Sequence, residues 1–117
     1  MLTLESSPTA EELKEIAREF GDYIKVVVDI KKGIVAAGGN LHSDEEKMLL
    51  EKGSQQVNLW GGGVDLVSGE FDCLSLINAR SNDGNPSQDI LDPEIRKKVL
   101  MILGKFFPKE VVINEQS

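Results

Sequence analysis

This chain of 117 residues contains one cysteine, Cys73, and one histidine, His42. A single cysteine excludes an intrachain disulfide, and one cysteine with one histidine cannot supply the four ligands of a structural zinc site. A reactive cysteine needs exposure and a neighbour that stabilises the thiolate. Cys73 stands among apolar residues, so the sequence favours a buried structural role for it.

The sequence also lacks long apolar runs. A membrane-spanning helix needs about 20 consecutive apolar residues, and no run in this chain approaches that length. The N-terminal segment MLTLESSPTAEELKE has no basic start followed by an apolar stretch, as a secretory signal peptide would have. We therefore expect a cytoplasmic protein that does not bind membranes.

The chain has fewer basic than acidic residues. The chain has 13 lysines and arginines against 20 aspartates and glutamates, which gives a net charge of -7. Nucleic-acid binding depends on a concentrated basic surface, and the tight basic clusters, Lys31-Lys32 and Arg96-Lys97-Lys98, are flanked by acids. We therefore expect no nucleic-acid partner. The excess of acid favours solubility, and it leaves open a regulatory role in which the acidic surface meets a basic protein.

Signature motifs of common enzymes and ion sites are missing. There is no EF-hand spacing and no G-x-S-x-G elbow for a serine nucleophile. The run Gly61-Gly62-Gly63 is followed by strand-like residues, whereas a phosphate-binding loop leads into a helix. We therefore expect no cofactor, and we interpret the glycines as a β-bulge or a hairpin tip.

The segment SSPTAEELKEIAREFG predicts the first of three helices. Thr9 and Glu12 have the spacing of a capping box, and Ser7 before Pro8 is an alternative cap. Gly21 is a natural C-terminal stop. The apolar stripe comprises Leu13, Ile16, Ala17 and Phe20.

Two further helices are predicted from their caps. In HSDEEKMLLEKGS, Ser43 and Glu46 repeat the capping-box spacing and Gly53 ends the helix. In DPEIRKKVLMILGKFFP, Asp92 is expected to cap a longer helix with Pro93 at its first position. The core stripe of this helix comprises Ile95, Val99, Ile102, Leu103 and Phe106.

Alternating apolar residues predict a β-hairpin formed by residues 24–30 and 34–37. Its even-numbered apolar residues share one face, which we expect to be buried. The other face is mostly polar, and comprises Tyr23, Lys25, Val27 and Asp29.

More strands are predicted in the second half of the chain. One covers residues 57–66 and is interrupted by the glycine run, and a turn at Ser68-Gly69 leads to another at 70–78. The 70–78 segment has apolar residues on both faces, which indicates an interior strand. Residues 111–113 are a candidate edge strand, and the tail from about residue 109 is expected to fray.

This order of elements indicates an α+β fold. Strands joined by short turns pair antiparallel, and two amphipathic terminal helices need a sheet face to cover. We expect a two-layer sandwich with a mainly antiparallel or mixed sheet of about four to five strands, and with the N- and C-terminal helices packed on one face. The whole chain, residues 1–117, is expected to form a single domain.

Three segments carry a resemblance to a known family: FGDYIKVVVDIKKGIVAAGGNLHSDEEKMLLEKGS, QQVNLWG and INARSNDGNPSQDILDPEIRKKV. They resemble a family of short uncharacterised bacterial and archaeal proteins that is classed as a domain of unknown function. The specific parts are the G-LH-DEE, NLWG and DPEIR fragments, and the match covers roughly residues 10–105. Relatives carry more arginine in the loop before DPEIR than this chain does. The resemblance implies a small domain and no particular activity.

The loop after Asn78 is the richest candidate for a binding site. About a dozen irregular residues exceed the usual loop length, and such loops are often functional. Arg80 is the strongest candidate ligand residue in the loop, because a guanidinium group can form two parallel hydrogen bonds to a carboxylate or phosphate. The alternative is a structural loop of turn formers in which Arg80 pairs with a nearby aspartate. The candidate ligand-binding residues are Asn78, Arg80, Asn82, Asn85, Ser87 and Trp60, of which Trp60 is either a core residue or a lid.

His42 is the other candidate for chemistry. It is followed by Asp44 and Glu45, so the three residues could bind a metal ion together with a distant carboxylate such as Asp65 or Asp72. The alternative is that His42 merely precedes a helix whose first turn attracts acidic residues.

These observations favour a small, non-enzymatic binding or interaction module whose polar site is in the 78–89 loop. Its ligand is an unidentified small polar molecule or a protein partner. One alternative is a hydrolase-like enzyme that uses His42 and nearby carboxylates, with or without a metal ion. A second is an acidic regulatory partner of a basic protein. Formation of a homodimer is left open.

Overall fold

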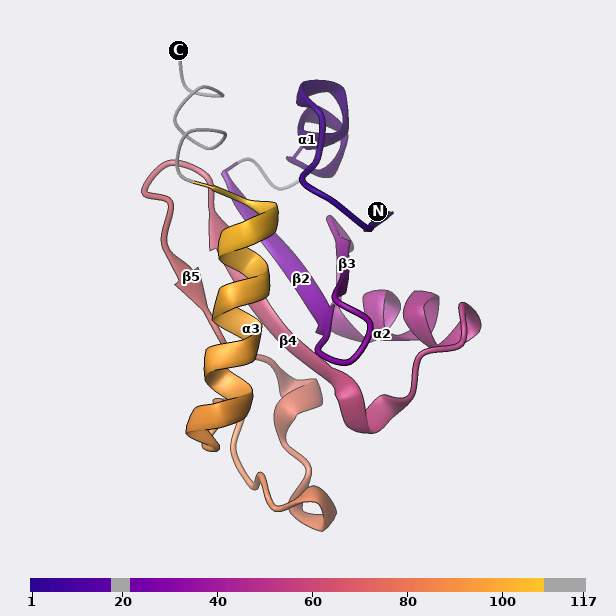
Figure 1. Ribbon diagram of the computed structural model, residues 1–117, viewed down its shortest axis with the longest axis vertical. Coiled ribbons are helices and arrows are strands. Elements are labelled where there is room, and N and C mark those ends of the chain that lie inside the picture. The colour runs from indigo at the N-terminus through magenta and orange to yellow at the C-terminus, as the bar shows by residue number, and fades with distance from the viewer. Residues whose placement is uncertain (18–21, 109–117) are drawn as a thin grey trace.

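The computed structural model describes residues 1–17 and 22–108. In these residues, five antiparallel strands form one sheet in the order β1-β3-β2-β4-β5 (Figure 1). The strands are β1 (Leu2–Leu4), β2 (Tyr23–Asp29), β3 (Ile34–Ala37), β4 (Leu59–Asp65) and β5 (Phe71–Asp72). The helices are α1 (Ala10–Ala17), α2 (His42–Glu51) and α3 (Pro93–Phe106). The predicted α+β class is confirmed. None of the helices described is long and apolar enough to cross a membrane.

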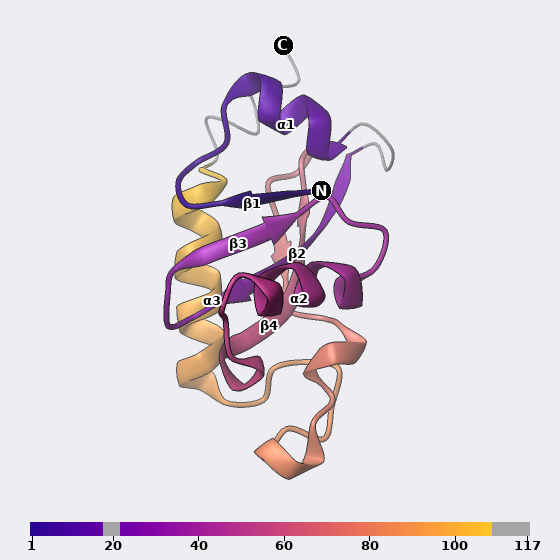
Figure 2. The same cartoon turned by 90° about the vertical axis from the view of Figure 1, so that its right-hand side faces the viewer.

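Both faces of the sheet are covered. Figure 2 shows α3 and α2 on opposite sides of the sheet, with α1 beyond β1. The larger core cluster joins the sheet to both α1 and α3, as predicted for the terminal helices, and includes Leu13, Ile16, Val26, Val28, Trp60, Val99, Leu103 and Phe106. The smaller cluster under α2 comprises Val27, Ala36, Leu49 and Leu59.

The second core corrects the expectation for the β2–β3 hairpin. Its face with Val27 and Asp29 was expected to be mostly polar and open, yet both side chains are fully buried. The reason is that α2 packs on this face. Asp29 is accommodated because its carboxylate accepts hydrogen bonds from the backbone of Lys31 and Lys32 and from the Ser54 hydroxyl.

The N-terminal caps of α1 and α3 are confirmed. The backbone N–H of Thr9 donates to Glu12 Oε1 at 2.9 Å, and the Glu12 N–H donates to Thr9 Oγ1 at 3.1 Å. Asp92 Oδ1 accepts from the N–H of Glu94 at 2.9 Å, with Pro93 at the first helical position. The predicted stop of α1 at Gly21 and its stripe residue Phe20 lie outside the described residues.

The predicted capping box of α2 is wrong. The helix begins at His42, and the residue before it, Leu41, makes no side-chain cap bond. Ser43 lies inside the first turn, where it cannot cap the helix. The predicted end is confirmed, since Gly53 follows Lys52 with a φ of 96° that favours glycine.

The three glycines lie inside β4 and form neither a bulge nor a hairpin tip. A Cβ atom at Gly61 would lie 2.6 Å from Ser75 Cβ. At Gly62 it would meet the carbonyl oxygen of Asp72, and at Gly63 the hydroxyl of Tyr23. The glycines therefore let neighbouring segments lie directly on the strand.

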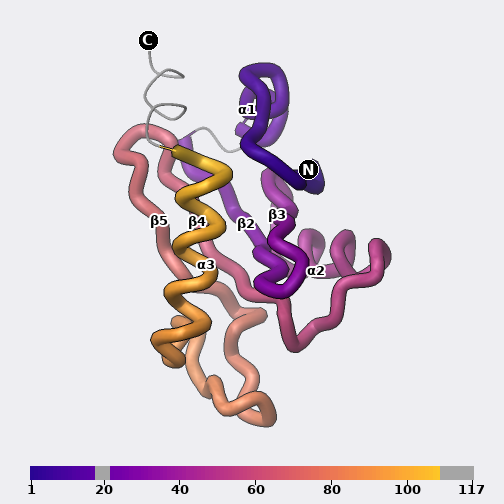
Figure 3. The backbone as a smooth tube through the Cα atoms, in the orientation of Figure 1, coloured from indigo at the N-terminus to yellow at the C-terminus, as the bar shows by residue number. Residues whose placement is uncertain are grey.

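The predicted interior strand at 70–78 is wrong. Only Phe71–Asp72 forms a strand, at the edge of the sheet, and Leu76–Asn78 is a 3-10 turn. Leu74 and Leu76 are exposed. Figure 3 shows the segment between β5 and α3 extending beyond the end of the sheet. The strand at Leu2–Leu4 was not predicted, and the candidate strand at 111–113 lies outside the described residues.

Candidate functional site

The loop from residue 78 to 89 is held in shape by Asn78. This side chain is fully buried. Its Oδ1 accepts from the N–H of Gly61 at 2.8 Å, and its Nδ2 lies 3.0 Å from the carbonyl oxygens of Gly61 and Cys73 and 3.1 Å from that of Gln88. The amide of Asn78 thus joins strand β4 to both ends of the loop.

Asn85 performs the same task inside the loop. Its Nδ2 lies 2.8–2.9 Å from the carbonyl oxygens of Asn78, Ser87 and Asp89, to which its two N–H groups donate, and its Oδ1 accepts from the N–H of Leu91. The Ser87 hydroxyl accepts from the N–H of Asp89. The polar atoms of these candidate ligand residues are therefore engaged by the backbone of the loop itself.

Arg80 lies at the base of the loop against Trp60. Its guanidinium carbon is 3.9 Å from the centre of the Trp60 ring, and its Nη1 donates to the carbonyl oxygen of Gln56 at 2.6 Å. Trp60 is 2 % exposed and belongs to the larger core, so its ring is a core platform and not a mobile lid. The ring and the Gln56 carbonyl together set the plane of the guanidinium group.

The remaining edge of the Arg80 guanidinium is free of hydrogen bonds. Its side chain is 9 % exposed, and Nε and Nη2 are buried without a hydrogen-bond partner. The carboxylate of Asp83 stands 3.6 Å from Nε, which is ion-pair distance but too long for a hydrogen bond. Burial lowers the pKa of Arg80, and the negative charges of Asp83 and Glu46 oppose that shift.

Arg80 also forms part of the wall of a cavity of about 410 Å³. The rest of the wall comprises Gln56, Ala79, Ser81, Asn82 and Asp83. Asn82, a predicted ligand residue, is exposed at this cavity. Sequence reasoning missed Gln56, because its backbone meets Arg80 from 24 positions away along the chain and no local pattern marks that contact.

His42 lies over the glycine strand and away from the loop. Its Nε2 is 2.7 Å from the carbonyl oxygen of Gly62, and a carbonyl oxygen can only accept, so this nitrogen carries the proton. Burial lowers the pKa of His42, which favours the neutral imidazole. Nearby, the Tyr23 hydroxyl donates to Asp72 Oδ2 at 2.7 Å.

The structure separates the three predicted metal ligands. His42 bonds to Gly62, Asp44 is exposed, and Glu45 is fully buried with its Oε2 accepting from the N–H of Gly39 at 3.0 Å. Within residues 1–17 and 22–108, no group of three His, Cys, Asp or Glu side chains is placed to hold a metal ion. Cys73 is buried in the larger core, as predicted, and burial raises the pKa of its thiol.

A family model described as "Protein of unknown function (DUF5674)" matches residues 2–106. The chain belongs to this family. Searches of the curated proteins and of the solved structures found no match. The description of DUF5674 names no ligand, partner or reaction, so a functional proposal for this DUF5674 protein depends on the geometry of its own residues.

Proposed function

We propose that this DUF5674 protein is a small binding module that holds the carboxylate or phosphate group of a polar ligand at Arg80. The observation that carries the proposal is the buried edge of the guanidinium group, where Nε and Nη2 have no hydrogen-bond partner. Leaving buried donors unsatisfied costs about 1–3 kcal/mol, and more for a charged group. An oxyanion that bonds to this edge removes that cost.

The chemistry of this edge suits a planar or tetrahedral oxyanion. Parallel N–H groups of a guanidinium match the two oxygens of a carboxylate or phosphate, and such charge-assisted pairs are stronger than neutral hydrogen bonds. Trp60 and the Gln56 carbonyl hold the group in one orientation, so little side-chain entropy remains to be lost on binding. Ser81 and Asn82 on the same cavity wall supply a hydroxyl and an amide for the rest of the ligand.

Asp83 is the internal counter-ion of Arg80 in this scheme. Its side chain is 36 % exposed and makes no hydrogen bond to Nε. It can therefore rotate toward solvent when a ligand oxyanion takes its place. A partly exposed ion pair of this kind contributes only about 0–1 kcal/mol, so a bidentate ligand can displace it.

Isothermal titration calorimetry tests the proposal with inorganic phosphate, succinate and a nucleoside monophosphate as probes. Arg80→Lys keeps the positive charge but removes the pair of parallel N–H donors. We therefore expect the affinity for the tightest-binding probe to fall by at least about tenfold, which is about 1.4 kcal/mol of binding free energy. Arg96→Lys is the matched control, because Arg96 already pairs with Asp89 at 2.6 Å. Equal affinity of the wild type and Arg80→Lys, or binding of none of the three probes, contradicts the proposal.

The hydrolase-like activity stays a prediction. The observation that favours it is the neutral His42 beside the Tyr23–Asp72 pair on the glycine strand. Its test is hydrolysis of p-nitrophenyl esters and phosphates by the wild type and by His42→Ala. Equal turnover by the wild type and His42→Ala, or no turnover by the wild type, would contradict a hydrolase-like activity that uses His42.

A further inference from the structure

A second candidate site lies away from Arg80, in a cavity between α1 and α2. It has a volume of about 700 Å³. A neighbouring cavity of about 640 Å³ shares the lining residue Lys52 with it. The first begins at Met1 and the second runs past Thr3 and Leu4, so the pair follows β1. We call this pair of cavities the α1–α2 groove. It shares no lining residue with the Arg80 cavity.

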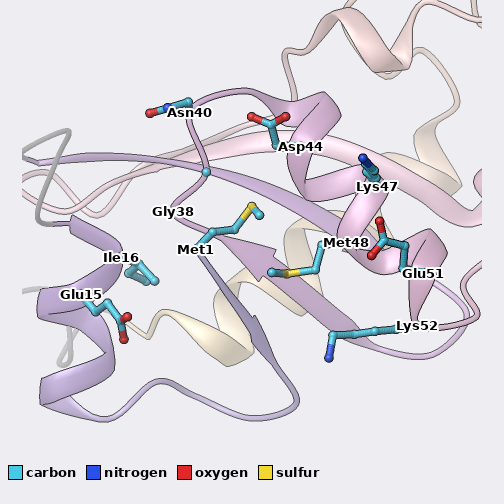
Figure 4. A pocket seen from close by; sticks show the side chains of 11 residues that line it. Met1, Glu15, Ile16, Gly38, Asn40, Asp44, Lys47, Met48, Glu51 and Lys52 are labelled. Carbon is cyan, nitrogen blue, oxygen red and sulfur yellow. The ribbon is translucent and has the colours of Figure 1, made fainter.

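The floor of the groove is apolar and adaptable. Figure 4 shows the side chains of Met1 and Met48 between the helix that carries Ile16 and the helix that carries Lys47. Methionine is unbranched and flexible, so it moulds to different apolar groups. A Cβ atom at Gly39 would lie 2.9 Å from the Met1 sulfur, so the absence of a side chain there makes room for Met1.

The walls of the groove carry an excess of acid. Carboxylates from both helices and from the segment after β1 line the two cavities, namely Glu5, Glu12, Glu15, Asp44 and Glu51. Three lysines oppose them: Lys32, Lys47 and Lys52. Both ion pairs found in the described residues lie elsewhere, at Arg80–Asp83 and Arg96–Asp89. Apart from Glu12, whose Oε1 accepts from the Thr9 N–H, the charges of the groove are therefore available to a partner.

A buried carboxyl group lies next to the groove. Glu45 is fully buried, and its Oε1 has no hydrogen-bond partner. Its Cγ and the Met1 sulfur each lie 2.9 Å from the position that a Cβ atom of Gly39 would take. The side chains of Glu45 and Met1 therefore both lie against Gly39, which lines the first cavity.

We propose that the α1–α2 groove binds an extended peptide segment of a partner protein in which lysine or arginine alternates with leucine- or methionine-like side chains. Successive side chains of an extended peptide point to opposite sides, so apolar residues can reach the methionine floor while cationic residues meet the acidic walls. Each cavity alone is the size of a small-molecule site. Two cavities in series along β1 fit a longer ligand, and the net charge of -7 favours a basic one.

Fluorescence anisotropy of the full chain with the labelled peptide Lys-Leu-Lys-Met-Lys-Leu-Lys tests the proposal. We expect saturable binding, and affinity lower by at least about tenfold when serine replaces the leucines and methionine. Glu51→Lys reverses a groove charge and should weaken binding by roughly tenfold. Glu94→Lys makes the same charge change on the exposed first turn of α3 and is the matched control.

Methyl NMR of the methionines locates the peptide without any substitution. The chain has three methionines: Met1 and Met48 line the groove, and Met101 is exposed on α3. We expect the peptide to shift the first two methyl signals and to leave the third unchanged. Equal binding of the serine peptide, equal loss in both charge variants, or shifts at Met101 alone overturns the proposal. Saturation of the same shifts by free leucine at similar concentration also overturns it, in favour of a small zwitterionic ligand.

Discussion

At the scale of single residues, Glu45 is the most unusual ionisable group that the structure describes. It is fully buried, with one bond from the Gly39 N–H and one oxygen without a partner. Burial, opposed by the bond from Gly39 and by the charge of Lys25, raises the pKa of Glu45 from 4.5 to about 9. The folded protein therefore holds this proton at neutral pH.

The buried proton predicts how stability depends on pH. Between about pH 4.5 and 9 the unfolded chain ionises at Glu45 while the folded chain stays protonated, so the folded state binds more protons. The free energy of unfolding must then fall as pH rises through this window. Glu45→Gln removes the effect, and its stability relative to wild type should rise toward pH 9 by at most several kcal/mol, at about 1.4 kcal/mol per pKa unit.

Urea unfolding at pH 5 and pH 8.5 measures this difference. Glu51→Gln is the control, because Glu51 is exposed on the same helix. Parallel behaviour of Glu45→Gln and wild type at both pH values would show that Glu45 is ionised in the folded protein.

Asp83 provides a second prediction at this scale, which rests on the proposed oxyanion site. Asp83→Asn removes the charge that stands 3.6 Å from Arg80 Nε. Because the partly exposed pair is worth up to about 1 kcal/mol, the variant should bind the same anionic probe up to about fivefold more tightly. Calorimetry measures the change, and weaker binding by Asp83→Asn would mean that this carboxylate assists the ligand.

At the scale of elements, the glycines of β4 determine how closely the second half of the chain approaches the sheet. Gly61 and Gly63 lie on the face of the sheet that α2 covers. Ser75 and His42 occupy the space that a side chain at Gly61 would need, and Tyr23 occupies the corresponding space at Gly63. Gly62 allows β5 to pass close by. The strand is therefore a platform for the loop residues and not a flexible tip.

Adding one methyl group tests this account. Gly61→Ala places a Cβ atom 2.6 Å from Ser75 Cβ, and such overpacking typically costs about 1–3 kcal/mol. Gly104→Ala is the matched control, since its Cβ would meet only Phe71 at 3.9 Å inside α3. Alanine there should stabilise the helix by up to about 1 kcal/mol. Chemical denaturation measures both, and a neutral Gly61→Ala would mean that Ser75 and its loop yield at little cost.

At the scale of the whole molecule, local patterns were predicted well and long-range contacts were not. The caps at Thr9 and Asp92 and the β2–β3 hairpin depend on neighbours in sequence, and all three are confirmed. The shape of residues 73–78 depends on a distant partner, and the first turn of α2 contains a contact that the capping-box spacing does not mark. Glu45 turns toward Gly39, and Asn78 bonds to Gly61, 17 positions earlier.

The same limit applies to the candidate site. The sequence indicated the loop and Arg80 from length and residue type. It could not show that Asn78 and Asn85 bind the loop's own backbone, or that Trp60 and Gln56 hold the guanidinium group. The contacts of Arg80 with Trp60 and Gln56 join segments far apart in the chain, and the short-range bonds of Asn85 follow no spacing that marks them in the sequence.

The measurement that tests the central claim most directly is a ¹H–¹⁵N NMR titration of the arginine Nε–H groups with phosphate or succinate. The chain has three arginines, and Arg96, which is paired with Asp89, serves as an internal control. We predict a saturable downfield shift of the Arg80 Nε–H signal, with little change at Arg96, because the bound oxyanion accepts a hydrogen bond from Nε. An Arg80 signal that stays unchanged while the probe binds, or that shifts no more than the Arg96 signal, would contradict an oxyanion site at Arg80.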